Sequence, residues 1–206
     1  MRHLNPVRHA DVSQPHDDFY PPGQLSGHLS EVSGDNTCAR TTMAIAALLQ
    51  AQGRGEPTAW VQFVGGALYP PDLALNGVDL RSLAVVRIPS RAGYVGLFKA
   101  TELLLRSGGI GMVVVDFGGA QRPVICATAW QGRLSALARE HRASVLFITD
   151  KTLAMGSLGP LVSLRLQPQR LRRGRCAFAV QCLYVKNKLG LQPAPPLLFQ
   201  APWGLR

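Results

Sequence analysis

Short apolar segments alternate with longer amphipathic segments along the first three quarters of the chain. Five short segments are predicted to be strands, and the second of them is rich in β-branched and aromatic residues; they span residues 29–33, 58–64, 83–87, 112–116 and 144–149. Between them, apolar positions recur at helical spacing over residues 41–52, 71–76, 92–107 and 127–141. Continuous apolar strands separated by helices are typical of a parallel sheet that is buried on both faces. The pattern therefore predicts an α/β fold with a mostly parallel sheet flanked by helices.

The alternation of strands and helices stops after Thr149. Leu161–Gln167 and Cys176–Lys186 are expected to be two strands joined by a basic connection, Pro168–Arg175, which together form a C-terminal antiparallel hairpin at the sheet edge. Residues 1–23 are polar and are predicted to form a flexible tail, so the core domain is assigned to residues 24–190. Residues 191–206 are rich in proline and cannot form a long helix. They are expected to be either an ordered surface strap or a partner-binding tail.

Positive charge is concentrated in the C-terminal quarter. The formal net charge is +10, the last acidic residue is Asp150, and residues 151–206 contain nine Lys or Arg and no Asp or Glu. This asymmetry favours contact with a polyanion such as single-stranded DNA, or with an acidic protein surface. The alternative is a compositional bias toward arginine at solvated positions. No apolar run approaches ~20 residues, so we expect no membrane contact and a cytoplasmic protein, associated with the nucleoid after DNA damage.

One loop between a predicted strand and helix resembles a phosphate-binding motif. Residues 34–41 read GDNTCART against the pattern GxxxxGK[ST], in which backbone amides and the lysine cradle phosphates and the hydroxyl holds magnesium. Gly34 and Thr41 match. Ala39 replaces a glycine, and its Cβ crowds the approach of a phosphate. Arg40 replaces the lysine and keeps the charge in a longer, forked group. These residues are interpreted as a vestigial nucleotide site.

Two further observations bear on catalysis. Asp116 ends a predicted strand, where it could orient magnesium or simply cap the following turn. No carboxylate lies between Glu56 and Asp72, so the end of the second strand has no general base. We therefore expect no catalytic residues and a pseudo-ATPase. No cofactor is expected, although residual binding of ATP and magnesium stays open, and the cysteine and histidine spacing predicts no metal site.

Two basic groups are the candidate sites for nucleic acid or a partner protein. One is the loop cluster Arg170, Arg172, Arg173 and Arg175, which has the density of a phosphate-contacting patch. The other is the pair Lys186 and Lys188, which point to the same face of a predicted strand. The alternative for the arginine cluster is a solvated turn. No aromatic residues are interleaved in it, so base stacking is not indicated.

The order of these parts resembles the core of the RecA recombinase family over Leu25–Gly190. The most specific matching segments are Ala67-Leu68, GVDLRSL at residues 77–83, RSG at residues 106–108 and VKNK at residues 185–188. The segment TAWV at residues 58–61, followed by GALYPP at residues 66–71, looks most similar to the ImuA type of RecA-like protein, which is encoded in damage-inducible mutagenesis cassettes. SulA-type division inhibitors belong to the same loop-deficient group.

The resemblance implies roles for individual positions. It places Gly65 where RecA has a glutamate that activates water, and it places Thr149-Asp150 at a polar sensor. Lys186 and Lys188 match lysines that reach a neighbouring subunit's nucleotide in RecA filaments. The resemblance thus implies a non-catalytic accessory factor in SOS-induced translesion synthesis and mutagenesis.

The partners that the resemblance implies are an ImuB-type Y-family-like protein, RecA, an error-prone replicative-type polymerase and single-stranded DNA. A long homofilament is not expected. A slow or conditional DNA-dependent ATPase and a SulA-type division inhibitor are the alternatives.

Overall fold

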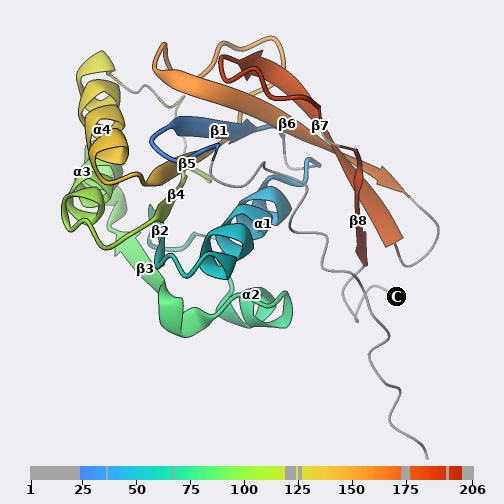
Figure 1. The fold of residues 1–206 in the computed structure, drawn as a ribbon, viewed down its shortest axis with the longest axis horizontal. Coiled ribbons are helices and arrows are strands. Elements are labelled where there is room, and N and C mark those ends of the chain that lie inside the picture. The colour runs from blue at the N-terminus through green and yellow to red at the C-terminus, as the bar shows by residue number, and fades with distance from the viewer. Residues whose placement is uncertain are drawn as a thin grey trace, which may run out of the picture.

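The sheet is the organising feature of the fold (Figure 1). A computed structural model of the chain describes residues 24–35, 37–66, 68–118, 124, 127–172, 177–193 and 195–200. Its eight strands lie in one sheet in the order β3-β2-β4-β5-β1-β6-β7-β8. Their bounds are β1 Leu29–Ser33, β2 Thr58–Phe63, β3 Leu83–Ile88, β4 Met112–Asp116, β5 Ser144–Thr149, β6 Val162–Arg172, β7 Ala177–Asn187 and β8 Leu197–Gln200. The pairs from β3 to β6 are parallel, and the pairs β6–β7 and β7–β8 are antiparallel. The predicted α/β class with a C-terminal antiparallel extension is confirmed.

Four α-helices and two short 3₁₀ helices complete the described structure. Their bounds are α1 Arg40–Gly53, α2 Pro70–Leu75, α3 Gly93–Arg106 and α4 Thr128–Glu140, with 3₁₀ turns at Leu80–Ser82 and Ser90–Ala92. Figure 1 shows α1 on one side of the sheet, with α3 and α4 together on the other side. No helix in the described part of the chain is long and apolar enough to cross a membrane.

Each face of the sheet carries its own apolar core. On the α1 face, Met43 and Leu48 pack with Trp60 and Val114. On the opposite face, Phe98 of α3 lies 5.6 Å from Phe117 and stacks on Trp130 of α4 at 5.8 Å between ring centroids. Successive side chains of a strand point to opposite faces, so the central strands must be apolar at nearly every position to fill both cores. This requirement explains the continuous apolar runs in the sequence.

The antiparallel hairpin is longer than the sequence pattern indicated. Pro168–Arg172 was expected to belong to the connection, but these residues continue β6 and pair with β7, with Pro168 opposite Cys182. That expectation was wrong, because Pro168 is accommodated within β6. β1 pairs with β6 only as far as Leu166, so beyond this point β6 has a free side where the missing N–H of proline breaks no ladder.

The C-terminal segment also contributes to the sheet. Leu197–Gln200 form β8, which pairs antiparallel with the start of β7. Leu197 is buried in the α1-side core, whereas Leu198 is 63% exposed. The described part of this segment therefore behaves as an ordered strap, one of the two alternatives predicted for it.

Candidate functional site

The loop between β1 and α1 is closed on itself. Gly34 adopts a φ of +148°, a conformation that side chains rarely adopt, and a Cβ placed there would lie 2.7 Å from the Cβ of Cys38 and 2.6 Å from its sulfur. The Cys38 side chain therefore packs directly against the Gly34 backbone. Glycine at position 34 is explained by this close approach within the loop.

A carboxylate of the loop binds the loop's own donors. The backbone N–H of Thr37 donates to Oδ1 of Asp35 at 2.9 Å, and the Thr37 hydroxyl donates to the same oxygen. These two bonds lower the pKa of Asp35, so the carboxylate stays ionised. Phosphate-binding loops direct such amides at a ligand anion. Here the Asp35 carboxylate accepts hydrogen bonds from the Thr37 amide and hydroxyl of the same loop.

Ala39 and Arg40, which replace the glycine and lysine of the motif, both have side chains that are largely covered by the rest of the protein. Ala39 is 2% exposed, and its carbonyl accepts the first helical hydrogen bond from Met43. Arg40 begins α1, its side chain is only 11% exposed, and its guanidinium forms an ion pair with Asp150. The guanidinium also donates to the carbonyl of Thr149 at 3.1 Å. The cation of the motif is therefore engaged by the loop that follows β5, while Thr41 is exposed at the start of the helix.

Asp116 lies at the end of β4, near this ion pair. Burial raises the pKa of its carboxyl group, while the backbone N–H of Gly118, which donates to Oδ1 at 2.8 Å, and the charge of Arg40 oppose the shift. Gly65 occupies a turn after β2 at φ +85°, and a Cβ there would meet nothing within 4 Å. The turn thus has space for a side chain but carries none, and no carboxylate at position 65 can activate water.

The predicted basic residues are distributed over two regions. Lys186 donates to Ser157 Oγ at 3.1 Å and to the carbonyl of Gly159 at 3.0 Å, and Lys188 donates to the carbonyl of Pro160 at 2.8 Å. Arg170 lies over the ring of Phe178 at 4.8 Å. Arg172 ends β6, and Arg173 and Arg175 lie outside the described residues. Arg165 pairs with Lys186 and Arg170 with Val180 along the hairpin, so of the described residues Arg170 lies at a different position along the hairpin from the lysine pair.

Sequence reasoning missed a buried charged pair in the sheet. Glu31 in β1 and Arg165 in β6 lie opposite each other in register, and both are 0% exposed. Glu31 accepts from the Thr149 hydroxyl and from the backbone N–H of Leu158, both at 2.7 Å. The detectable signal was a single charged residue inside each of two predicted strands, because a buried charge needs a partner.

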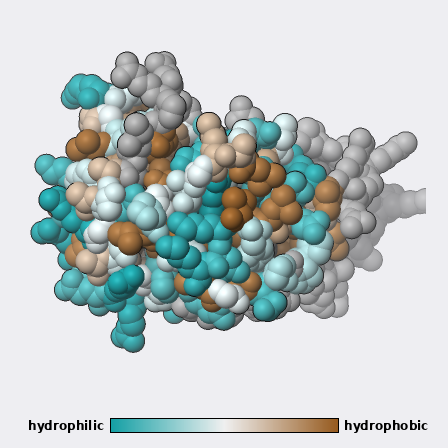
Figure 2. All heavy atoms as spheres, turned by 90° about the horizontal axis from the view of Figure 1, so that it is seen from above, coloured by the Kyte–Doolittle hydropathy of each residue, from teal (hydrophilic) through white to brown (hydrophobic). Residues whose placement is uncertain are grey.

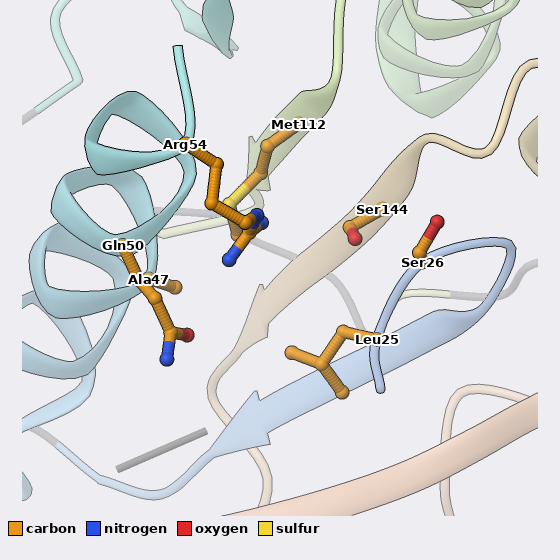
Figure 3. Close-up of a pocket in the computed structure, with 7 residues that line it drawn as sticks. All are labelled: Leu25, Ser26, Ala47, Gln50, Arg54, Met112 and Ser144. Atoms are coloured by element: carbon orange, nitrogen blue, oxygen red, sulfur yellow. The ribbon is translucent and has the colours of Figure 1, made fainter. Parts of the chain in front are cut away.

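The small cavity in Figure 3 lies at the N-terminal ends of the strands, whereas the β1–α1 loop lies at their C-terminal ends. Its volume is about 10 Å³, space for roughly one water, and residues before β1, along α1 and at the starts of β4 and β5 line it. It is thus distant in the fold from the β1–α1 loop. Among the described residues no group of three or more His, Cys, Asp or Glu could hold a metal ion.

Comparison with known proteins identifies partial relatives. No family model matches the chain. The chain is 32% identical over 101 residues to Protein RecA of Francisella tularensis subsp. novicida (strain U112) and to Protein RecA of the subspecies tularensis strain SCHU S4. These matches cover 49% of this chain and 27% of each RecA protein, so the chain spans about a quarter of the relatives' length. The chain is therefore a distant, partial relative of RecA with a RecA-like α/β fold.

Proposed function

We propose that this chain is a non-catalytic RecA-like accessory factor that acts in translesion DNA synthesis and mutagenesis after DNA damage. The observation that carries the proposal is the self-occupied loop after β1. Asp35 accepts hydrogen bonds from the loop, and Arg40 is paired with Asp150. A nucleotide would have to compete with Asp150 for the arginine, and the exposed Asp35 carboxylate would repel a phosphate group brought to the loop. Both effects oppose the binding of a phosphate group.

The chemistry of hydrolysis is also unsupported. Gly65 provides no general base, and partial burial raises the pKa of the Asp116 carboxyl group. Loss of a single positioned proton-transfer group typically costs about 10²-fold or more in rate. The proposal therefore assigns the fold to binding, with nucleotide turnover absent.

The proposed partners follow from the RecA relationship and the charge distribution. We propose contacts with RecA, with an ImuB-type Y-family-like protein and with an error-prone replicative-type polymerase, with single-stranded DNA as a further ligand. Residues 151–206 carry nine basic and no acidic residues, which supports an anionic ligand or an acidic protein surface. Because the arginine of the loop is already paired, the proposal does not include a long homofilament joined by nucleotides.

Turnover assays test the absence of catalysis. Purified protein should release phosphate from ATP no faster than buffer, with or without single-stranded DNA. Turnover that disappears in Asp116→Ala, while Asp72→Ala stays active, would instead support a conditional ATPase. Asp72 is the matched control because it is an exposed carboxylate on α2.

Binding assays test the accessory role. Purified RecA should form a complex with the chain in sedimentation experiments, and light scattering of the chain alone should show small species with or without ATP. Absence of any complex with RecA and with an ImuB-type protein would reject the accessory role. Long filaments of the chain alone would reject the proposed mode of assembly.

A further inference from the structure

The connection between β5 and β6 is fixed in place by charged side chains beneath it. This connection, residues 150–161, is called the β5–β6 loop. It contains no helix or strand. Loops without regular structure are usually held by few contacts and are mobile. Here the anchoring groups come from β1, β6, β7 and the start of α1.

Two fully buried side chains hold the middle of the loop. Glu31 accepts a hydrogen bond from the backbone N–H of Leu158 at 2.7 Å and lies 3.7 Å from the ammonium of Lys151. Arg165 donates to the carbonyls of Thr152, at 2.7 Å, and Met155. A third bond, to Ser33 Oγ at 2.8 Å, fixes the guanidinium against β1.

The ends of the loop are held as well. Arg40 pairs with Asp150 at the beginning. Lys186 donates to Ser157 and Gly159, and Lys188 donates to Pro160 near the end. Desolvation and the neighbouring Lys188 lower the pKa of Lys186, whereas the charge of Glu31 raises it. Side-chain contacts therefore hold the loop at its beginning, in its middle and near its end.

The outward side of this rigid loop is apolar. Leu153 and Met155 are each 49% exposed, and Leu161 is 36% exposed. The loop contains no aromatic residue. Figure 2, which views the molecule from above, shows hydrophobic residues scattered among hydrophilic ones on that face of the molecule. A rigid loop that presents Leu and Met loses little conformational entropy when another surface covers it.

The surroundings of the loop are positively charged. Lys151 contacts Glu31, and Asp150 is matched by Arg40. The hydrogen-bond acceptors of Arg165, Lys186 and Lys188 are neutral hydroxyl and carbonyl oxygens. No acidic residue follows Asp150 in the sequence. In the described part of the chain these cations therefore leave an uncompensated positive field under an apolar surface.

We propose that the β5–β6 loop is a docking surface for an acidic segment of a partner protein, in which Leu153 and Met155 contact apolar side chains of that segment. The positive field steers the acidic segment toward the loop, and the apolar contacts retain it. Single-stranded nucleic acid fits less well. The loop has no aromatic side chain on which bases could stack.

Peptide selection tests this proposal with the full chain. Short random peptides displayed on phage are selected on the intact protein and counter-selected on the double variant Leu153→Ser, Met155→Ser. The double variant Val95→Ser, Leu103→Ser is the matched control, because these α3 residues are 58% and 61% exposed. Thermal unfolding establishes that both variants fold, which we expect because all four side chains are largely exposed.

The proposal expects selected peptides that combine Asp or Glu with Leu, Ile or Phe. In fluorescence anisotropy, such a peptide should bind about tenfold or more weakly to the loop variant and unchanged to the α3 control. Exchange of its acidic residues for Gln should weaken binding and reduce its salt dependence.

Failure to recover loop-dependent peptides, or recovery of peptides without acidic residues, would overturn the proposal. Labelled oligothymidylate serves as the second probe. Binding of this probe that is lost in the loop variant would overturn the proposal in favour of a nucleic-acid surface. Neither outcome depends on ATP turnover, so the proposed pseudo-ATPase character is judged separately.

Discussion

Replacing Arg165 with Ala tests whether a buried cation holds the β5–β6 loop. The Arg165 side chain is 0% exposed, and its three hydrogen bonds reach Ser33, Thr152 and Met155. Ala removes all three bonds and leaves two carbonyls and one hydroxyl without this donor. The loop can restore contact with water for these groups only by moving away from β6. We therefore expect both a global loss of stability and a local opening of the loop.

The magnitude follows from the number and kind of bonds. A hydrogen bond to a charged group contributes roughly 1.5–3 kcal/mol to the free energy of unfolding. Three such bonds would contribute about 5–9 kcal/mol if nothing offset them. Removing the guanidinium also removes its own desolvation cost, which amounts to several kcal/mol. The expected net loss in the free energy of unfolding is about 3 kcal/mol. Arg170→Ala is the matched control, because this exposed arginine on the same strand makes a ring contact with Phe178 worth about 0.5–1 kcal/mol.

Urea denaturation measures the global effect, and hydrogen exchange measures the local one. Arg165→Ala should lower the denaturation midpoint with little change in the slope, and the N–H of Leu158 should exchange faster than in the Arg170→Ala control. If Arg165→Ala cost no more stability than Arg170→Ala and left exchange in the loop unchanged, then the buried guanidinium would not be what fixes the loop.

Three other perturbations test the site and the core. Burial raises the folded-state pKa of Asp116, so the wild type loses stability as the pH rises from the ordinary value of 3.8 through that raised pKa. In urea titrations Asp116→Asn should therefore be more stable than the wild type at neutral pH, and this gain should vanish below pH 3.8. A gain that persists below pH 3.8 would contradict the assignment. Gly34→Ala should destabilise the fold by about 1–3 kcal/mol because its Cβ would clash with Cys38, whereas Gly65→Ala should cost less because nothing lies within 4 Å; equal melting temperatures would refute the closed loop. Burial raises the pKa of Cys182 to about 12, so mass spectrometry after mild alkylation should find Cys182 unmodified until the protein unfolds, and rapid modification would contradict its burial.

The periodicity of the sequence predicted the helices and strands, because a sheet covered on both faces restricts which segments can form its strands. Residues 29–33, 112–116 and 144–149 were assigned with the bounds that the structure has. These are central strands, in which every residue except the half-buried Asp116 is buried. The error came at Pro168, because the sequence alone does not show that β6 has a free side beyond Leu166.

The sequence showed which residues make up the candidate loop, but it did not show which other residues contact them. The replacement of the motif lysine by Arg40 was visible, whereas its pairing with Asp150 joins residues that lie 110 positions apart. Such a contact depends on the adjacency of β1 and β5 in the sheet. For the same reason the register of Glu31 opposite Arg165 could not be predicted, although each charge was conspicuous in an apolar strand. Sequence patterns thus gave the chemistry of single positions, and the topology decided which of them meet.

Calorimetric titration of the protein with ADP and with ATP, in the presence of magnesium, tests the central claim most directly. The claim is that the loop after β1 bonds to a carboxylate of its own and that its arginine is already paired. The account predicts no saturable heat, which corresponds to a Kd weaker than about 1 mM. Saturable binding in the micromolar range that is abolished by Arg40→Ala and retained by Arg170→Ala would contradict it.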